Sequence, residues 1–173
     1  MKILYVIIMM LFLGMVSCSE DNLKGYSSSN CIQFDKLSKD STVFSFAYDE
    51  TLESGTVALK LVMISPLVDR DRKYNVKFLQ DESSAQAGVD FEMPAEEQVI
   101  AANDSVAYLN VIVKRNKALK GSAIAVFEVQ VSDDFMPGIE ANRKGRIFIT
   151  NQLTRPGWWN DWHEANGLGT YSD

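Results

Sequence analysis

Histidine and cysteine are scarce in this chain of 173 residues, and their scarcity limits the chemistry that we expect of it. A single histidine, His163, excludes a multi-histidine metal site and leaves a nucleophilic triad with one imidazole at most. With only two cysteines, Cys18 and Cys31, a zinc site built from cysteines and histidine is disfavoured as well. We therefore predict no metal site and no cofactor.

Basic residues are outnumbered, 17 against 23 acidic ones, which gives a formal net charge of -6. A nucleic-acid-binding protein needs a clustered basic face, and the longest basic cluster here, residues 114–120, is typical of a solvated turn. We predict no nucleic-acid partner. The acidic neighbours Asp81 and Glu82, like Glu96 and Glu97, would point to opposite faces of a strand. They do not provide the two facing carboxylates of a glycosidase, so we predict that the protein is not an enzyme.

Long hydrophobic runs are also absent. The longest run, from Ile3 to Val16, has 14 residues, whereas a transmembrane helix needs about 20. After Lys2, such a run is typical of a secretory signal peptide. It ends in Met-Val-Ser-Cys at residues 15–18, which resembles a bacterial lipobox, where the cysteine is joined to diacylglycerol and becomes the first residue after cleavage. We predict a signal peptide over residues 1–17 and lipidation of the cysteine; the alternative is an ordinary signal peptide with an incidental cysteine.

Residues 18–30 comprise this acylated cysteine and a polar, serine-rich stretch that we interpret as a flexible tether. The segment Ser19 to Asn22 carries two acids and resembles the signal that sends Bacteroidota lipoproteins across the outer membrane. We therefore predict a lipid anchor in the outer membrane and a protein that faces the cell exterior; the alternative is a tether that is merely solvated. If Cys18 is acylated, Cys31 has no partner within the chain, so its thiol is expected to be buried or paired between chains, and we predict burial.

Strand signals dominate residues 31–151, which we predict to form one domain. No helical periodicity of three turns occurs before residue 151, and alternating apolar residues recur between glycines and prolines. The candidate strands are Cys31–Phe34, Thr42–Tyr48, Gly55–Ile64, Tyr74–Leu79, Val106–Val113, Ala123–Val131 and Gly145–Thr150. Their number and spacing predict an all-β fold, an antiparallel immunoglobulin-like β-sandwich.

All three tryptophans, Trp158, Trp159 and Trp162, lie in the last segment, residues 152–173. A short helix from Trp158 to Ala165 would place Trp158 and Trp162 on one face; the rest of the segment is expected to be irregular. Binding sites pair aromatic rings with a few polar groups, and sugar rings have apolar faces that stack on aromatics. We therefore take the three tryptophans as candidate ligand-binding residues. The alternative is that they pack against the end of the sandwich, since tryptophan buries a large area.

The stretch from Ser84 to Val113 resembles the central motif of Calx-beta domains. Its turn, Ala-Gly-Val-Asp-Phe at residues 87–91, is the part that carries the likeness. Gly88 allows a tight backbone, Asp90 is expected to accept hydrogen bonds from loop amides, and Phe91 is expected to pack inward. The resemblance implies a Calx-beta-like sandwich.

Calx-beta domains can bind calcium, and those that do carry an acidic cluster after the valine-rich strand. This chain has Lys-Arg-Asn-Lys there, at residues 114–117, and these cations would repel the metal. A calcium site would require Asp90, Asp133 and Asp134 to meet at one end of the sandwich. We predict simple hydrogen bonding in the loops instead.

The mature chain as a whole resembles a family of Bacteroidota lipoproteins catalogued as domain of unknown function 4843. The likeness rests on the leader, the acidic tether, the strand entry at residues 69–78, the turn at residues 87–94 and Thr-Arg-Pro-Gly-Trp-Trp at residues 154–159. Family members usually continue past the Gly-Leu-Gly-Thr-Tyr-Ser step, so the resemblance implies that segment 152–173 belongs either to a truncated product or to a shortened member of the family. Their genes often neighbour outer-membrane glycan-uptake systems.

These features predict a surface-exposed outer-membrane lipoprotein, a non-enzymatic accessory linked to glycan binding or uptake. Its partners would be the membrane, through the N-terminal lipid anchor, and a glycan or outer-membrane transport proteins. The alternative is a structural or assembly partner of outer-membrane proteins that binds no glycan.

Overall fold

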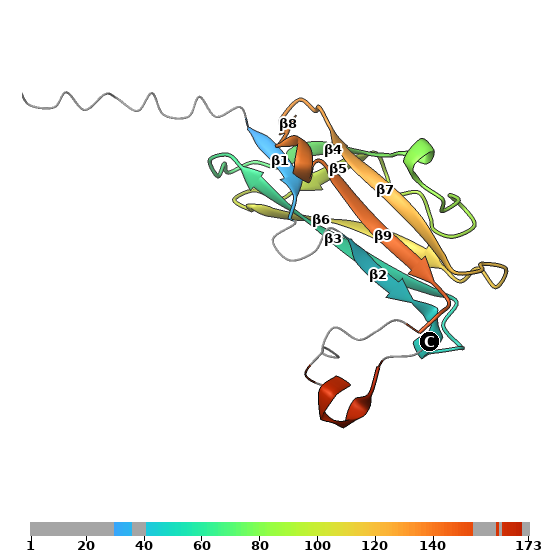
Figure 1. Ribbon diagram of the computed structural model, residues 1–173. Helices are drawn as coiled ribbons and strands as arrows, with labels where there is room; N and C mark the ends of the chain where they lie inside the picture. The colour runs from blue at the N-terminus through green and yellow to red at the C-terminus, as the bar shows by residue number, and fades with distance from the viewer. Residues whose placement is uncertain (1–29, 36–40, 154–161, 163, 171–173) are drawn as a thin grey trace, which may run out of the picture.

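The computed structural model describes residues 30–35, 41–153, 162 and 164–170, and it is a two-layer β-sandwich (Figure 1). Over these residues one sheet has the strand order β6-β3-β1-β8 and the other has the order β2-β9-β7-β4-β5. We call them sheet A and sheet B. The strands are β1 Cys31–Phe34, β2 Thr42–Ser45, β3 Ser54–Ile64, β4 Arg72–Phe78, β5 Glu97–Ile100, β6 Val106–Lys114, β7 Ser122–Gln130, β8 Met136–Pro137 and β9 Lys144–Thr150. Short helical turns are η1 Phe46–Tyr48, η2 Gln80–Glu82, η3 Glu140–Asn142 and η4 Glu164–Leu168.

The alternation of apolar residues predicts the core correctly. In β3, Val57, Leu59 and Leu61 point inward and are buried, because successive side chains of a strand point to opposite faces. The same alternation buries every second residue of β6, from Ala107 to Val113. Both strands lie in sheet A, and their inner faces meet those of sheet B across a continuous hydrophobic core. The all-β sandwich prediction is therefore confirmed.

Two strand pairings depart from the antiparallel prediction. β2 runs parallel to β9, with Thr42 opposite Ile147, and β1 runs parallel to β8, with Cys31 opposite Met136. β2 is also shorter than the predicted strand. The backbone N–H of Ala47 donates to the Ser45 hydroxyl at 3.2 Å, and this cap starts the turn η1. The two-residue strand β8 escapes sequence analysis because it has no alternation to detect, and its proline suits a sheet edge.

A buried arginine holds together the loops at the end of the sandwich where β1 begins. Arg72 is 2% exposed, and its guanidinium donates to the Ser65 hydroxyl at 2.7 Å and to the Asp104 carbonyl at 3.4 Å. The guanidinium also lies 4.8 Å from the centre of the Phe135 ring. The loops β3–β4, β5–β6 and β7–β8 thus meet on one cation, which the alternation pattern did not reveal.

Within the described part of the chain, none of the helices is long and apolar enough to cross a membrane.

Candidate functional site

The Calx-beta-like turn is built as its residues predict. Gly88 has a φ of +84°, a backbone conformation that side chains disfavour. Asp90 is 3% exposed, and its carboxylate accepts from the Gln86 N–H at 2.7 Å and from the Asn116 side-chain amide at 2.8 Å. Phe91 is fully buried against the rings of Phe78 and other core residues. The predicted roles of glycine, aspartate and phenylalanine in this turn are confirmed.

Within the basic cluster after β6, Lys117 and Lys120 are exposed as expected of a solvated turn, but Arg115 is not. The Arg115 guanidinium donates to the carbonyls of Leu52 and Phe46, at 2.7 Å each, and to the carbonyl of Asp49. It also lies 5.0 Å from the centre of the Phe46 ring. Arg115 is partly enclosed because the connection between β2 and β3 folds over the end of β6 and presents its carbonyls to this side chain. A fixed positive charge therefore sits one residue from Asn116, the partner of Asp90.

The three aspartates that a calcium site would require do not meet. Asp90 lies beside the start of β7, where Ser84 and Ala85 bond to Ile124, whereas Asp133 and Asp134 follow the end of that strand. Asp134 instead binds Arg70 and accepts from the Lys73 N–H at 2.8 Å. Hydrogen bonding from Arg70, and then from this N–H, lowers the pKa of Asp134.

No metal cluster forms elsewhere in the described residues either, since no three histidine, cysteine, aspartate or glutamate side chains come together there. Two of the four neighbouring acids considered from the sequence serve as ion-pair partners. Glu82, in the turn η2, pairs with Lys144, and Glu97, in β5, pairs with Lys73 at 2.9 Å. These pairs lie at the surface and do not present two facing carboxylates.

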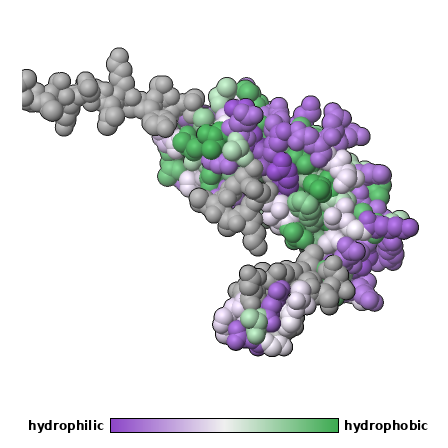
Figure 2. All heavy atoms as spheres, viewed as in Figure 1, coloured by the Kyte–Doolittle hydropathy of each residue, from purple (hydrophilic) through white to green (hydrophobic). Residues whose placement is uncertain are grey.

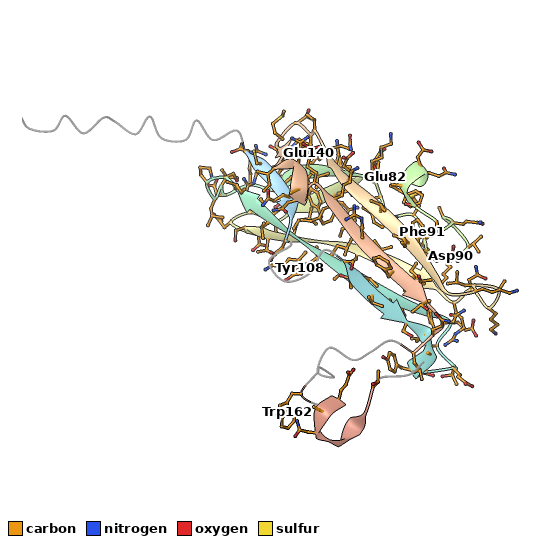
Figure 3. All side chains as sticks on the ribbon, viewed as in Figure 1. Glu82, Asp90, Phe91, Tyr108, Glu140 and Trp162 are labelled. Atoms are coloured by element: carbon orange, nitrogen blue, oxygen red, sulfur yellow. The ribbon has the colours of Figure 1, made fainter. Side chains whose placement is uncertain are left out.

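Of the candidate ligand-binding tryptophans, only Trp162 falls within the described residues. Its side chain is 66% exposed, and its carbonyl accepts from the side-chain amide of Asn166 at 2.7 Å (Figure 3). The turn η4 follows directly, with Gly167 at a φ of +113°. Trp158 and Trp159 lie outside the described residues, as do His163 and the lipidation site Cys18.

Cys31 is half-buried rather than buried as expected. It starts β1 opposite Ile64, and Ile64 is exposed on the outer face of sheet A. Its neighbour in sequence, Ile32, takes the inward position. The position of the strand was predicted correctly. Because Ile32 and Phe34 point into the core, Cys31 lies on the other face of β1.

Family membership follows from the whole chain rather than from this site. A model for the family described as Domain of unknown function (DUF4843) matches residues 24–173. The chain belongs to this family. The match covers both sheets and the tryptophan segment of this DUF4843 member, which confirms the predicted family; the leader and the acidic segment Ser19 to Asn22 lie outside the matched residues.

Solved structures similar to this DUF4843 protein include the apo-form Calx CBD1 domain, with 9% identity, 73% of this chain and 100% of that chain covered, and a TM-score of 0.54. CBD12 from CALX1.2 matches with 9% identity, 69% of this chain, 43% of that chain and a TM-score of 0.51. A Bacteroides ovatus protein described as a candidate carbohydrate binder reaches 12% identity, 71% and 37% coverage and a TM-score of 0.48. Comparison with curated proteins gives no match. At these identities the likeness concerns the fold alone.

Proposed function

We propose that this protein is a surface-exposed, lipid-anchored outer-membrane lipoprotein that captures glycan without cleaving it. The lipobox at residues 15–18 and the acidic Ser19 to Asn22 support the anchor and the exterior location. The diacylglycerol on Cys18 would place two acyl chains in the bilayer. Each buried methylene contributes about 0.8 kcal/mol, and two chains hold a protein on a bilayer. The sandwich would then stand close to the membrane on a short tether.

The observation that carries the glycan proposal is the exposure of Trp162. An indole that leaves 66% of its surface in water forgoes burial that would stabilise the fold. Glu164 and Asn166 both lie in η4, two and four residues after Trp162, so a carboxylate and an amide follow the ring closely in the sequence. Aromatic rings with a few polar groups are typical of ligand sites, and a pyranose offers both an apolar face and hydroxyls.

The test is binding of the purified mature chain to a panel of soluble glycans. We expect Trp162→Ala to weaken binding of the best glycan at least about tenfold, and Trp162→Phe to keep most of it, because phenylalanine retains a ring to stack on. Circular dichroism shows whether each variant is folded. If the parent bound no glycan of the panel, the proposal would be wrong.

A second candidate function, the assembly partner of outer-membrane proteins, is favoured by one observation. Large apolar side chains are exposed near the start of β1: Ile64 at 45%, Leu67 at 56% and Met136 at 48%. Figure 2 shows hydrophobic atoms gathered on this side of the fold. On the proposed anchor, this end faces the membrane and its proteins. Co-purification of one outer-membrane transport protein at fixed stoichiometry, lost in Leu67→Ser but kept in Trp162→Ala, would support this function over glycan capture.

A further inference from the structure

The outer face of sheet A carries a row of three side chains from three adjacent strands. Tyr108 of β6 lies opposite Lys60 of β3 in the antiparallel register. The Lys60 ammonium binds the carboxylate of Asp35, which directly follows β1, at 2.8 Å. The backbone N–H of Asp35 also donates to the Lys60 carbonyl at 2.9 Å. An aromatic ring, a cation and a carboxylate therefore stand side by side on a regular sheet.

The strand pattern forces Tyr108 outward. Its neighbours Ala107 and Leu109 are buried in the core, so the ring takes the solvent face, where it is 52% exposed. β6 is the outermost strand of sheet A, and within that sheet it has a partner strand on one side only. Figure 3 marks Tyr108 on the strands of this sheet. Residues 90–92 bond to the far end of this edge, at Ile112 and Lys114, beyond Tyr108 in the sequence.

The polar pair beside the ring is held in place before any ligand arrives. The side chain of Asp35 is 11% exposed and that of Lys60 is 44% exposed, so the carboxylate is largely enclosed while the ammonium reaches water. Hydrogen bonding to Asp35 raises the pKa of Lys60, which keeps the ammonium charged. The pair has no net charge, and its exposed ammonium offers donors to a ligand.

The next register position leaves space and adds an amide. Ala58 of β3 lies opposite Asn110 of β6, and both are exposed on the same face as Tyr108. The small Ala58 side chain leaves a low point next to the taller lysine and tyrosine. The Asn110 amide, two residues from Tyr108, provides a donor and an acceptor at its rim.

We propose that this face, formed by Tyr108, Lys60, Asp35 and Asn110, is a binding subsite for a neutral pyranose. The apolar face of the sugar stacks on the Tyr108 ring, while its hydroxyls accept from Lys60 and bond to the Asn110 amide; Asp35 holds the Lys60 ammonium in position. A nucleic acid would need a net positive face, and an apolar peptide would cover the ammonium of Lys60, whose side chain is 44% exposed, without offering it an acceptor. The inference rests on the proposed glycan capture and adds a site on the sheet that is separate from Trp162.

The test measures binding of neutral oligosaccharides of glucose, mannose and galactose to the purified mature chain by calorimetry. We expect Tyr108→Ala to raise the Kd of the best oligosaccharide at least about tenfold, and Tyr108→Phe to raise it far less. Asp35→Asn is expected to weaken binding while leaving the ring in place. Tyr48→Ala is the matched control, because Tyr48 is a tyrosine with 62% exposure outside this face, and we expect it to bind as the parent does.

A second measurement needs no substitution. In nuclear magnetic resonance titrations with the same oligosaccharide, the amide signals of Ala58, Lys60 and Asn110 should shift. If those signals stay unchanged and Tyr108→Ala binds as tightly as the parent, while Trp162→Ala does not bind, the sheet subsite is wrong and the proposed glycan capture stands. If the parent binds none of the oligosaccharides and no glycan of the wider panel, both are wrong.

Discussion

Asp90 and Asp134 have the same side chain but very different surroundings. Asp90 is enclosed by the turn that contains it, and a backbone N–H and the Asn116 amide both donate to its carboxylate. Asp134 is half-buried, with 13% of its side chain exposed, and it pairs with Arg70, whose own side chain is 62% exposed. Because buried donors cannot turn to water when their acceptor is removed, the two aspartates should respond differently to substitution.

Replacing Asp90 with alanine should destabilise the fold by about 2–4 kcal/mol, because the Gln86 N–H and the Asn116 amide lose their acceptor inside the protein. Urea unfolding followed by circular dichroism measures the change. Asp133→Ala is the control, since Asp133 is exposed, and it should stay within about 0.5 kcal/mol of the parent. Equal effects of the two substitutions would contradict the assigned role of Asp90.

The Asp134 carboxylate should make stability depend on acid pH. Its pKa is lowered in the folded state, chiefly by the hydrogen bond from Arg70, so its contribution is present above the pKa of the unfolded chain. That contribution is lost as the pH falls through the lowered pKa. We therefore expect Asp134→Asn to be less stable than the parent at pH 7, with the difference shrinking toward pH 2. Urea midpoints across this range check it; a gap that widened in acid would have the wrong sign.

At the scale of elements, the long strands and the short ones differ in how far the sequence predicts them. Alternate residues are buried along β6 and at residues 57–61 of β3, while β7 buries Val126 in addition to its alternating residues. The existence and inward faces of these long strands therefore follow from local pattern. β2 and β8 are short, and each lies parallel to a strand distant in the sequence. Their formation depends on the strand that they meet, which no local pattern contains.

The connection between β2 and β3 depends on a single side chain from another element. Arg115→Ala should destabilise the protein by about 1–3 kcal/mol, because three carbonyls lose their donor and the Phe46 ring loses its cation. Arg115→Lys should recover little, since one ammonium cannot reproduce the planar fork. Hydrogen exchange should show lost protection across residues 46–53.

Lys117→Ala is the matched control for this element. Lys117 belongs to the same basic cluster, but its side chain is 77% exposed and pairs only with an exposed glutamate. Its substitution should change stability by less than about 0.5 kcal/mol. If Lys117→Ala and Arg115→Ala proved equally mild, the arginine would not hold the connection.

At the scale of the whole molecule, the two ends of the sandwich differ in the residues that they expose. The sandwich begins at β1, beside the exposed Ile64 and Met136, and it ends with β9 at the other end of the fold, beside the loops that Arg115 ties together. Thr150, the last residue of β9, donates to the Gly121 carbonyl at 2.9 Å. On the proposed lipid anchor, the first end would face the membrane, and the tryptophan segment would leave from the second.

The anchor itself is tested at Cys18. Mass spectrometry of the protein from its native membrane should find residues 1–17 removed and acyl chains on this cysteine, and Cys18→Ser should no longer sediment with membranes. Proteases added to intact cells should reach the parent protein, since the proposed location is the cell exterior. An unmodified thiol at this position, or a retained leader, would remove the basis for the proposed location.

The candidate sites, like the strands, differ in whether the sequence alone predicts them. The role of Asp90 could be predicted because its donors lie in its own turn and in the loop that follows the next long strand. The row of Asp35, Lys60 and Tyr108 could not be predicted, because it exists only in the register of three strands. The one available signal was an aromatic residue at an outward position of an alternating strand. The tertiary structure also moved Arg115 from an expected solvated turn to a cluster of carbonyls.

The amino-acid sequence alone determined the all-β class, the inward faces of the long strands and the conformation of the turn at Gly88, because alternation and backbone geometry act between near neighbours in the chain. Only the tertiary structure decided which sheet each strand joins, which acids are enclosed and which polar side chains stand beside Tyr108. Those outcomes depend on contacts between segments tens of residues apart, whose energies arise only when the two sheets close on their common core.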